Sequence, residues 1–204
     1  MHAIITDGSI SKYINHPKPL VIGDVRYPAR IFSVWTANEL AAIGIIEVTF
    51  DDSKKKDEQW YINTNQTYTY DADAGTVTAT YGNATAKAHA DTLWTAQDET
   101  DGKGTEGEVA TRGLKYNFIK TIKAQAAGIL QDTDWYILRK ADADTDVPSA
   151  ITTFRAAVRT KAAAMETLIT NASNTAAIKT LYTYTTNSDG VQSRPLGELP
   201  TLES

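Results

Sequence analysis

Two long amphipathic segments dominate the second half of the chain. In residues 108–131, apolar side chains recur at intervals of three and four, which places them on one face of an α-helix. This first stripe consists of Leu114, Phe118, Ile122, Ala126 and Ile129. A second stripe with the same spacing consists of Ile151, Phe154, Val158, Ala162, Met165 and Ile169. The pattern predicts two amphipathic helices, with Arg155, Arg159 and Lys161 on the solvent side of the second.

The connection between the two stripes is short. Asp134-Trp135 ends the first helix or begins a new turn, and an acidic turn follows at residues 141–146. Pro148 falls within the first turn of the second helix, where its missing N–H costs nothing, and Asp146 or Ser149 is the expected cap. We expect an antiparallel hairpin with Trp135 filling its corner, because short connections favour neighbouring helices. Packing of the two stripes between subunits is the alternative.

Residues 1–94 have the pattern of short strands separated by turns. Residues 3–6 and 9–14 flank Asp7-Gly8, a dipeptide that favours a tight hairpin turn. Residues 45–50, 59–70 and 76–81 read as further strands, and residues 16–27 as a loop. Thr36 and Glu39 have the spacing of a capping box and predict one short helix over residues 37–43, ended by Gly44.

The remaining segments are polar or broken by proline. Residues 95–107 are charged and rich in glycine, which is typical of a flexible linker. Residues 178–185 read as a strand, and Pro195, Gly197 and Pro200 predict an extended tail. The predicted fold is therefore α+β in four parts: a β-rich head (1–94), an acidic linker (95–107), a helical hairpin (108–174), and a C-terminal strand with its tail (175–204).

Composition narrows the classes of function. The chain has 204 residues, a net charge of −5 and no cysteine. A negative net charge disfavours nucleic-acid binding, which needs clustered Lys and Arg. The lack of cysteine excludes disulfides and thiolate metal sites. No apolar run is long enough to span a bilayer, and the first residues do not have the pattern of a signal peptide.

No group of residues predicts catalysis, a cofactor or a metal. Asp142, Asp144 and Asp146 have the spacing that opens a calcium loop, but Val147 and Thr153 stand where that loop needs Gly and Glu. The three histidines lack ligand spacing. No acid/base pair or nucleophile arrangement stands out, so we expect a protein that is not an enzyme.

One stretch resembles a domain of tailed bacteriophages. In that domain, a helix ending in Leu-x-x-Thr-Asp-Trp precedes an Arg-Lys turn and then Pro-x-x-[Ile/Val]-x-x-[Tyr/Phe]-Arg-x-x-[Val/Leu]-Arg. The matching residues are Leu130, Thr133, Asp134, Trp135, Arg139, Lys140, Pro148, Ile151, Phe154, Arg155, Val158 and Arg159. The resemblance covers roughly residues 108–170, and the head is similar at Tyr27-Pro28, Thr36, Glu39-Leu40 and Gly44.

Proteins of this family are tail fibre assembly chaperones or structural proteins of tails and baseplates. The resemblance implies a virion protein of the tail, made in the host cytoplasm, oligomeric, and in contact with other tail, baseplate or fibre proteins. An assembly chaperone that leaves the virion is the alternative. The family has no catalytic residues, so the residues expected to matter are structural or in contact with partners. They are Leu114, Phe118, Ile122, Asp134, Trp135, Pro148, Ile151, Phe154, Arg155, Val158 and Arg159.

Overall fold

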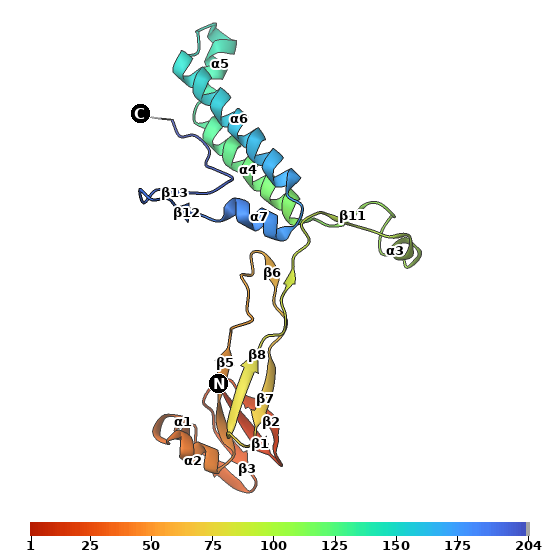
Figure 1. Cartoon of the computed structure of the whole chain (residues 1–204), viewed down its shortest axis with the longest axis vertical. Helices are drawn as coiled ribbons and strands as arrows, with labels where there is room; N and C mark the ends of the chain where they lie inside the picture. The colour runs from red at the N-terminus through yellow and green to blue at the C-terminus, as the bar shows by residue number, and fades with distance from the viewer. Residues whose placement is uncertain (203–204) are drawn as a thin grey trace. The chain divides into compact units, whose positions relative to one another are not determined.

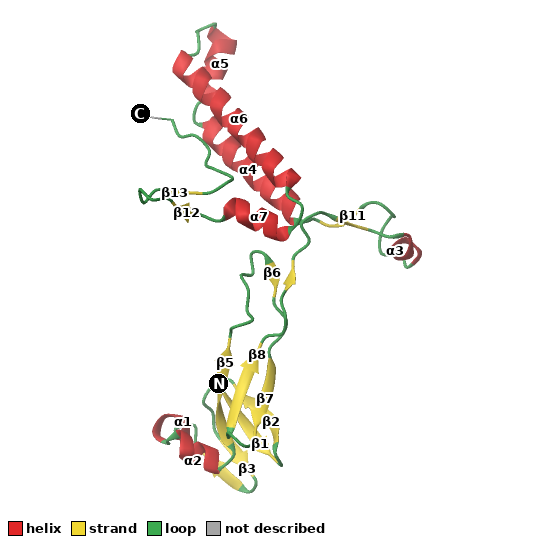
Figure 2. Ribbon diagram, viewed as in Figure 1, coloured by secondary structure: helices red, strands yellow, loops and turns green. Residues whose placement is uncertain are grey.

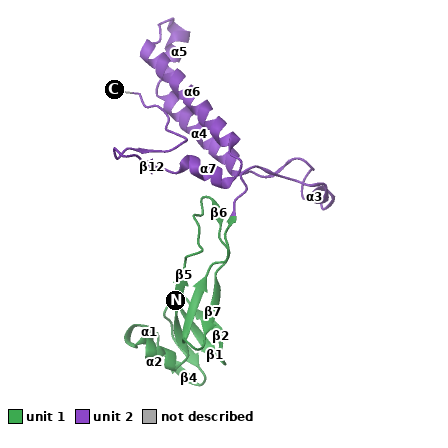
Figure 3. Cartoon of the chain, viewed as in Figure 1, with its two compact units in different colours: residues 1–85 green, residues 86–204 purple. Residues whose placement is uncertain are grey.

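The computed structural model describes residues 1–202, and the chain divides into two compact units, residues 1–85 and 86–204 (Figure 3). Strands make up most of the regular structure of the first unit, and long helices dominate the second (Figure 2). The α+β class is therefore confirmed. The boundary between the units lies nine residues earlier than the predicted end of the head at residue 94.

A five-stranded sheet forms the first unit, in the order β2-β1-β5-β8-β7 (Figure 1). Its strands are β1 (His2–Thr6), β2 (Ser9–Ile14), β5 (Ile45–Asp51), β7 (Thr67–Asp71) and β8 (Thr76–Thr80). Only β5 and β8 pair in parallel; the other neighbours are antiparallel. The rings of Tyr13 in β2 and Tyr68 in β7 are 4.7 Å apart, so the two edge strands approach each other and the sheet curls.

Local sequence signals account for the turns and the helix of this unit. Asp7 and Gly8 both have positive φ, as the predicted hairpin turn between β1 and β2 requires. The capping box is present at the start of α2 (Ala37–Ala42): the Glu39 amide donates to the Thr36 hydroxyl, and the Thr36 amide donates to the Glu39 carboxylate. Gly44 has φ 78°, and its carbonyl accepts a hydrogen bond of 2.7 Å from the Ile5 amide.

Three details of the first unit differ from the prediction. The expected loop at 16–27 contains a hairpin of β3 (Leu20–Ile22) and β4 (Val25–Tyr27), because Gly23 supplies a turn with positive φ. A second short helix, α1 (Ile31–Val34), precedes α2. The expected strand 59–70 is broken into β6 (Tyr61–Ile62) and β7, and β6 pairs instead with β9 (Thr85–Ala86).

The predicted helical hairpin is present in the second unit. Helix α4 (Leu114–Gln131) lies beside α6 (Ser149–Asn171), with α5 (Asp134–Ala143) in the connection (Figure 1). The stripes meet within one chain in a core that contains Ile122, Ala126, Val158, Ala162, Met165 and Ile169. Pro148 occupies the N-cap of α6, and no side chain caps that helix, so the cap predicted from Asp146 or Ser149 was wrong.

The segment predicted as a flexible linker has regular structure. Strands β10 (Thr92–Leu93) and β11 (Val109–Thr111) pair, and α3 (Ala96–Thr100) lies between them in the chain. A second capping box starts α3, where the Thr95 amide and hydroxyl both donate to Asp98. These bonds with Thr95, together with Lys103, lower the pKa of Asp98 to about 2. This box was not predicted, because the charged, glycine-rich composition of residues 95–107 indicated a linker.

The predicted strand at 178–185 was wrong, because residues Thr175–Tyr182 form helix α7. Asn174 begins this helix, since its side chain accepts a hydrogen bond of 2.9 Å from the Ala177 amide. Ile178 is fully buried. Two short strands follow, β12 (Thr185–Thr186) and β13 (Gln192–Ser193), which pair around a turn at Asp189-Gly190, where Gly190 has positive φ.

Two glycines at α4 give a paired prediction for stability. A Cβ added at Gly128 would have no atom within 4 Å, so Gly128→Ala should raise the free energy of unfolding by about 0.5–1 kcal/mol through helix propensity. Gly113 is the N-cap of α4, where alanine brings no propensity gain, and a Cβ there would collide with the Ala90 carbonyl, so Gly113→Ala should lower stability. Thermal unfolding followed by circular dichroism measures both. Equal shifts for the two variants would contradict the close approach of Ala90 to Gly113.

Candidate interaction surface

Arg155 holds the corner where α4 ends and α5 begins. This side chain comes from α6 and is only 7% exposed. Its Nη1 donates to the Thr133 hydroxyl at 2.6 Å and to the Leu130 carbonyl at 2.8 Å, and its Nη2 lies 2.8 Å from the Asp134 carboxylate. One guanidinium therefore ties the end of α4 and the start of α5 to α6.

The prediction that Arg155 lies on the solvent side was wrong. Arg155 falls four residues after Ile151 and three before Val158, so it continues the apolar stripe of α6. Its position in the helix therefore points it at the core. The burial is tolerated because both Nη groups have hydrogen-bond partners and Asp134 compensates the charge.

Trp135 does not fill the corner, so its predicted burial was also wrong. The side chain is 50% exposed, and its ring lies 4.2 Å from the ring of Tyr136. The Arg139 guanidinium stacks on its face, 4.6 Å from the ring centroid. Because Arg155 and the buried Thr133 already occupy the corner, the indole is directed away from it.

Helix α5 exposes its large apolar residues. None of its residues is buried, and Ile137 and Leu138 are 43% and 69% exposed. We call the group Trp135, Ile137 and Leu138 the α5 surface. Aspartates follow it in the loop to α6, where Lys140 bonds Asp144 and Asp146 at 2.7 Å each. These two bonds raise the pKa of Lys140, and the bond with Lys140 lowers the pKa of Asp146.

The other predicted residues differ in how deeply they are buried. Ile122, Ile151 and Val158 are buried in the hairpin, while Leu114, Phe118 and Phe154 are half-buried at its margins. The Phe118 ring lies 4.5 Å from the ring of Tyr182 in α7. Arg159 is exposed, as predicted. The structure therefore gathers Thr133, Asp134 and Arg155 at one point and spreads the remaining residues along the helices.

The role of residues 194–199 was not predicted from the sequence. This segment, which we call the strap, packs into the hairpin, and Leu196 is fully buried in the core with Met165 and Ile169. The Leu196 amide donates to the Leu181 carbonyl at 3.0 Å. Leu196 and Leu199 were the sequence signal for this packing, whereas Pro195 and Pro200 predicted an extended tail.

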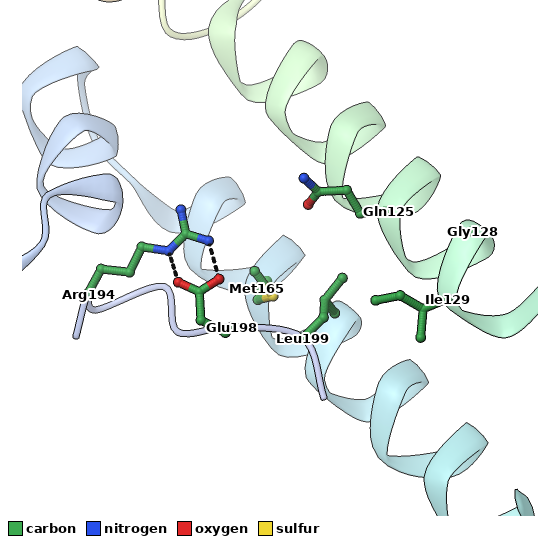
Figure 4. A pocket seen from close by; sticks show the side chains of 7 residues that line it. All are labelled: Gln125, Gly128, Ile129, Met165, Arg194, Glu198 and Leu199. Atoms are coloured by element: carbon green, nitrogen blue, oxygen red, sulfur yellow. Dashed lines mark hydrogen bonds and ion pairs between the residues drawn. The ribbon is translucent and has the colours of Figure 1, made fainter. Parts of the chain in front are cut away.

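A groove remains beside the strap (Figure 4). Its volume is about 450 Å³, and its lining residues are Gln125, Gly128, Ile129, Met165, Arg194, Glu198 and Leu199. Arg194 forms a two-point ion pair with Glu198, with Nε and Nη2 each 2.7 Å from a carboxylate oxygen. The Arg194 guanidinium also lies over the rings of Tyr182 and Tyr184, so this pair holds the strap in place.

Comparisons with protein-family models, with curated proteins and with solved structures found no match to this chain. Within residues 1–202, no three His, Cys, Asp or Glu side chains are grouped so that they could hold a metal ion. No helix in the described part of the chain has the length and apolar character needed to cross a membrane.

Proposed function

We propose that this chain is a structural component of a tailed-phage virion, in the tail or baseplate or at a point of fibre attachment. It acts by contacts with other tail proteins, as one copy among several, and not by catalysis. It is made in the host cytoplasm and is retained in the tail.

The observation that carries the proposal is the convergence of the two halves of the phage-like motif. Thr133 and Asp134 come from the Thr-Asp-Trp half, and Arg155 comes from the Phe-Arg half. They bond one another at 2.6–2.8 Å although more than twenty residues separate them in the chain. Trp135, the remaining residue of the first half, is left at the surface.

In this arrangement, one part of the motif positions α5 and another part is exposed for contact with a partner. The Arg155 cluster fixes the direction in which α5 leaves the hairpin, and α5 presents an aromatic residue and two aliphatic ones to solvent. Exposed apolar groups that gather on one element are typical of protein–protein contacts, and tryptophan is enriched among the residues that dominate binding. A structural protein of an assembly needs such a surface.

The alternative is a tail fibre assembly chaperone that does not stay in the virion. The same α5 surface would serve it, because a chaperone also binds another chain. The two candidates differ in whether the protein is found in the finished particle.

Peptide mass spectrometry on gradient-purified virions tests the proposal, with the copy number measured against the major tail protein. We expect the chain in the particle at a fixed copy number that is a multiple of three or six. Its absence from virions, together with abundance in infected cells, would contradict the structural role and favour the chaperone.

A further inference from the structure

Helix α5 lacks a covered apolar face. It has only ten residues and none of them is buried, and isolated helices of this length are marginal in water. The side that faces the rest of the chain is formed by Tyr136, Arg139 and Lys140, which are partly buried. Trp135, Ile137 and Leu138 face outward, so the usual orientation of an amphipathic helix is reversed.

The rim of the α5 surface is acidic. Residues 132–146 contain five aspartates and two basic residues, Arg139 and Lys140. Arg155 compensates Asp134, and Lys140 is shared by Asp144 and Asp146. Within residues 1–202, the exposed Asp132 and Asp142 make no ion pair. With Arg155 included, five aspartates stand against three basic residues, so the segment that carries the three exposed apolar side chains has a net charge of −2.

We infer that the α5 surface binds a cationic amphipathic segment of another protein. The apolar side chains of that segment contact Trp135, Ile137 and Leu138, and its Lys or Arg residues pair with Asp132 and Asp142. The inference rests on the proposed function in one respect, that the partner is a protein, and it specifies the chemistry of that partner.

Charge complementarity favours this occupant over the alternatives. A second copy of the chain would bring two acidic rims together, and like charges facing each other across an interface are unfavourable. An anionic lipid surface attracts basic segments and would repel this rim. A basic segment with one apolar face satisfies both the apolar and the charged parts of the surface.

The stacking of Arg139 on Trp135 adds to the argument. The guanidinium lies 4.6 Å from the indole centroid and 5.8 Å from that of Tyr136, and it restricts the rotation of the indole. An aromatic side chain held in place before binding loses less entropy when a partner covers it. The stacking therefore lowers the entropic cost of covering Trp135.

The test uses two labelled helical peptides of about 18 residues with the same leucine pattern. The polar positions carry lysine in one peptide and glutamate in the other. Fluorescence anisotropy of each peptide is measured against the whole chain in about 0.1 M salt, where exposed charges still act over ~10 Å. We expect binding of the leucine–lysine peptide and little binding of its leucine–glutamate counterpart.

Variants then locate the site on the chain. Leu138→Ser and Trp135→Ala should each weaken binding at least about tenfold, the loss typical of truncating a central contact residue. Asp132→Asn combined with Asp142→Asn should weaken binding and reduce its dependence on salt. All three should unfold at the same temperature as the parent chain, because the altered side chains are exposed.

Leu93→Ser is the matched control. Leu93 is 49% exposed and precedes an even more acidic segment, residues 98–108, which has five acidic residues and one lysine. If the leucine–lysine peptide bound through net charge alone, Leu138→Ser would not change its affinity. If the peptide bound at residues 98–108, Leu93→Ser would abolish binding. We expect Leu93→Ser to bind as the parent chain does.

The inference would be overturned by equal affinity for both peptides, by no binding of either, by loss of binding in Leu93→Ser but not in Leu138→Ser, or by a concentration-dependent dimer that Leu138→Ser abolishes. Binding to phosphatidylcholine vesicles that depends on Leu138 would also overturn the inference.

The virion experiment does not involve these peptides, so the two proposals can fail independently. A chain present in virions that binds neither peptide would remove this inference alone, and a chain absent from virions that binds the lysine peptide would remove only the structural role.

Discussion

Replacing Arg155 with alanine is expected to lower the free energy of unfolding of the second unit by about 2–4 kcal/mol. The change removes two hydrogen bonds and an ion pair, and it leaves a space among buried groups. Asp134 is half-exposed and can be solvated by water, which keeps the loss below that of a fully buried pair. Urea unfolding followed by far-ultraviolet circular dichroism measures the difference.

Arg159→Ala is the matched control for this prediction. Arg159 lies one turn further along α6 and is exposed, so its removal should change stability by less than about 0.5 kcal/mol. Arg155→Lys should fall between the two, because an ammonium cannot reproduce the geometry of both Nη groups. Equal losses for Arg155→Ala and Arg159→Ala would show that the corner does not depend on the guanidinium.

Leu196→Ala is expected to release the strap and to destabilise the second unit by about 2–4 kcal/mol. Leu196 is fully buried in the hairpin core, so the truncation leaves a cavity next to Met165 and Ile169. The loss of stability cannot exceed the free energy with which the strap binds to the hairpin, because α4 and α6 can stay paired after the strap detaches. Limited proteolysis should then cut between residues 183 and 193, which are exposed along their whole length.

Leu202→Ala provides the comparison for Leu196. Both leucines lie in the same proline-containing segment, but Leu202 is 47% exposed. Its truncation should leave both the unfolding curve and the rate of cleavage at residues 183–193 unchanged. A strap variant that is cleaved no faster than the parent chain would mean that Leu196 does not hold the strap in place.

The parts of the fold that the sequence predicted correctly are those with a strong local signal. The stripes of α4 and α6 repeat over many turns, and the Thr36–Glu39 box and the Asp7-Gly8 turn each satisfy a specific backbone requirement. Residues 178–185 gave a weaker signal. Alternating threonine and tyrosine favoured a strand, but Asn174 and the buried Ile178 stabilise a helix through contacts that propensity does not report.

At the corner between α4 and α5, the sequence identified Trp135 and Arg155 as important, but it predicted the wrong one of the two to be buried. Trp135 was expected inside because tryptophan is large and apolar, and Arg155 outside because it is charged. The structure reverses both, since three polar groups at the corner need a donor with several N–H bonds. The regular spacing of Ile151, Arg155 and Val158 contained this information, but residue type was given more weight than position.

The strap could not be predicted because its partner lies far away in the sequence. Two leucines near prolines specify no secondary structure. The place where they pack depends on the apolar side chains that α4 and α6 bring together. The exposure of the α5 surface was equally inaccessible, because it depends on which side of the helix the corner leaves uncovered.

The strap also sets an order of events during synthesis. A ribosome makes α4 and α6 before it makes residues 194–199, so the hairpin first forms with the site of Leu196 empty. During that interval, the apolar side chains of Met165 and Ile169 lack part of their cover. Residue 199 must therefore be synthesised before this core can be completed. Until then, the nascent chain exposes an apolar surface that ribosome-associated chaperones can bind.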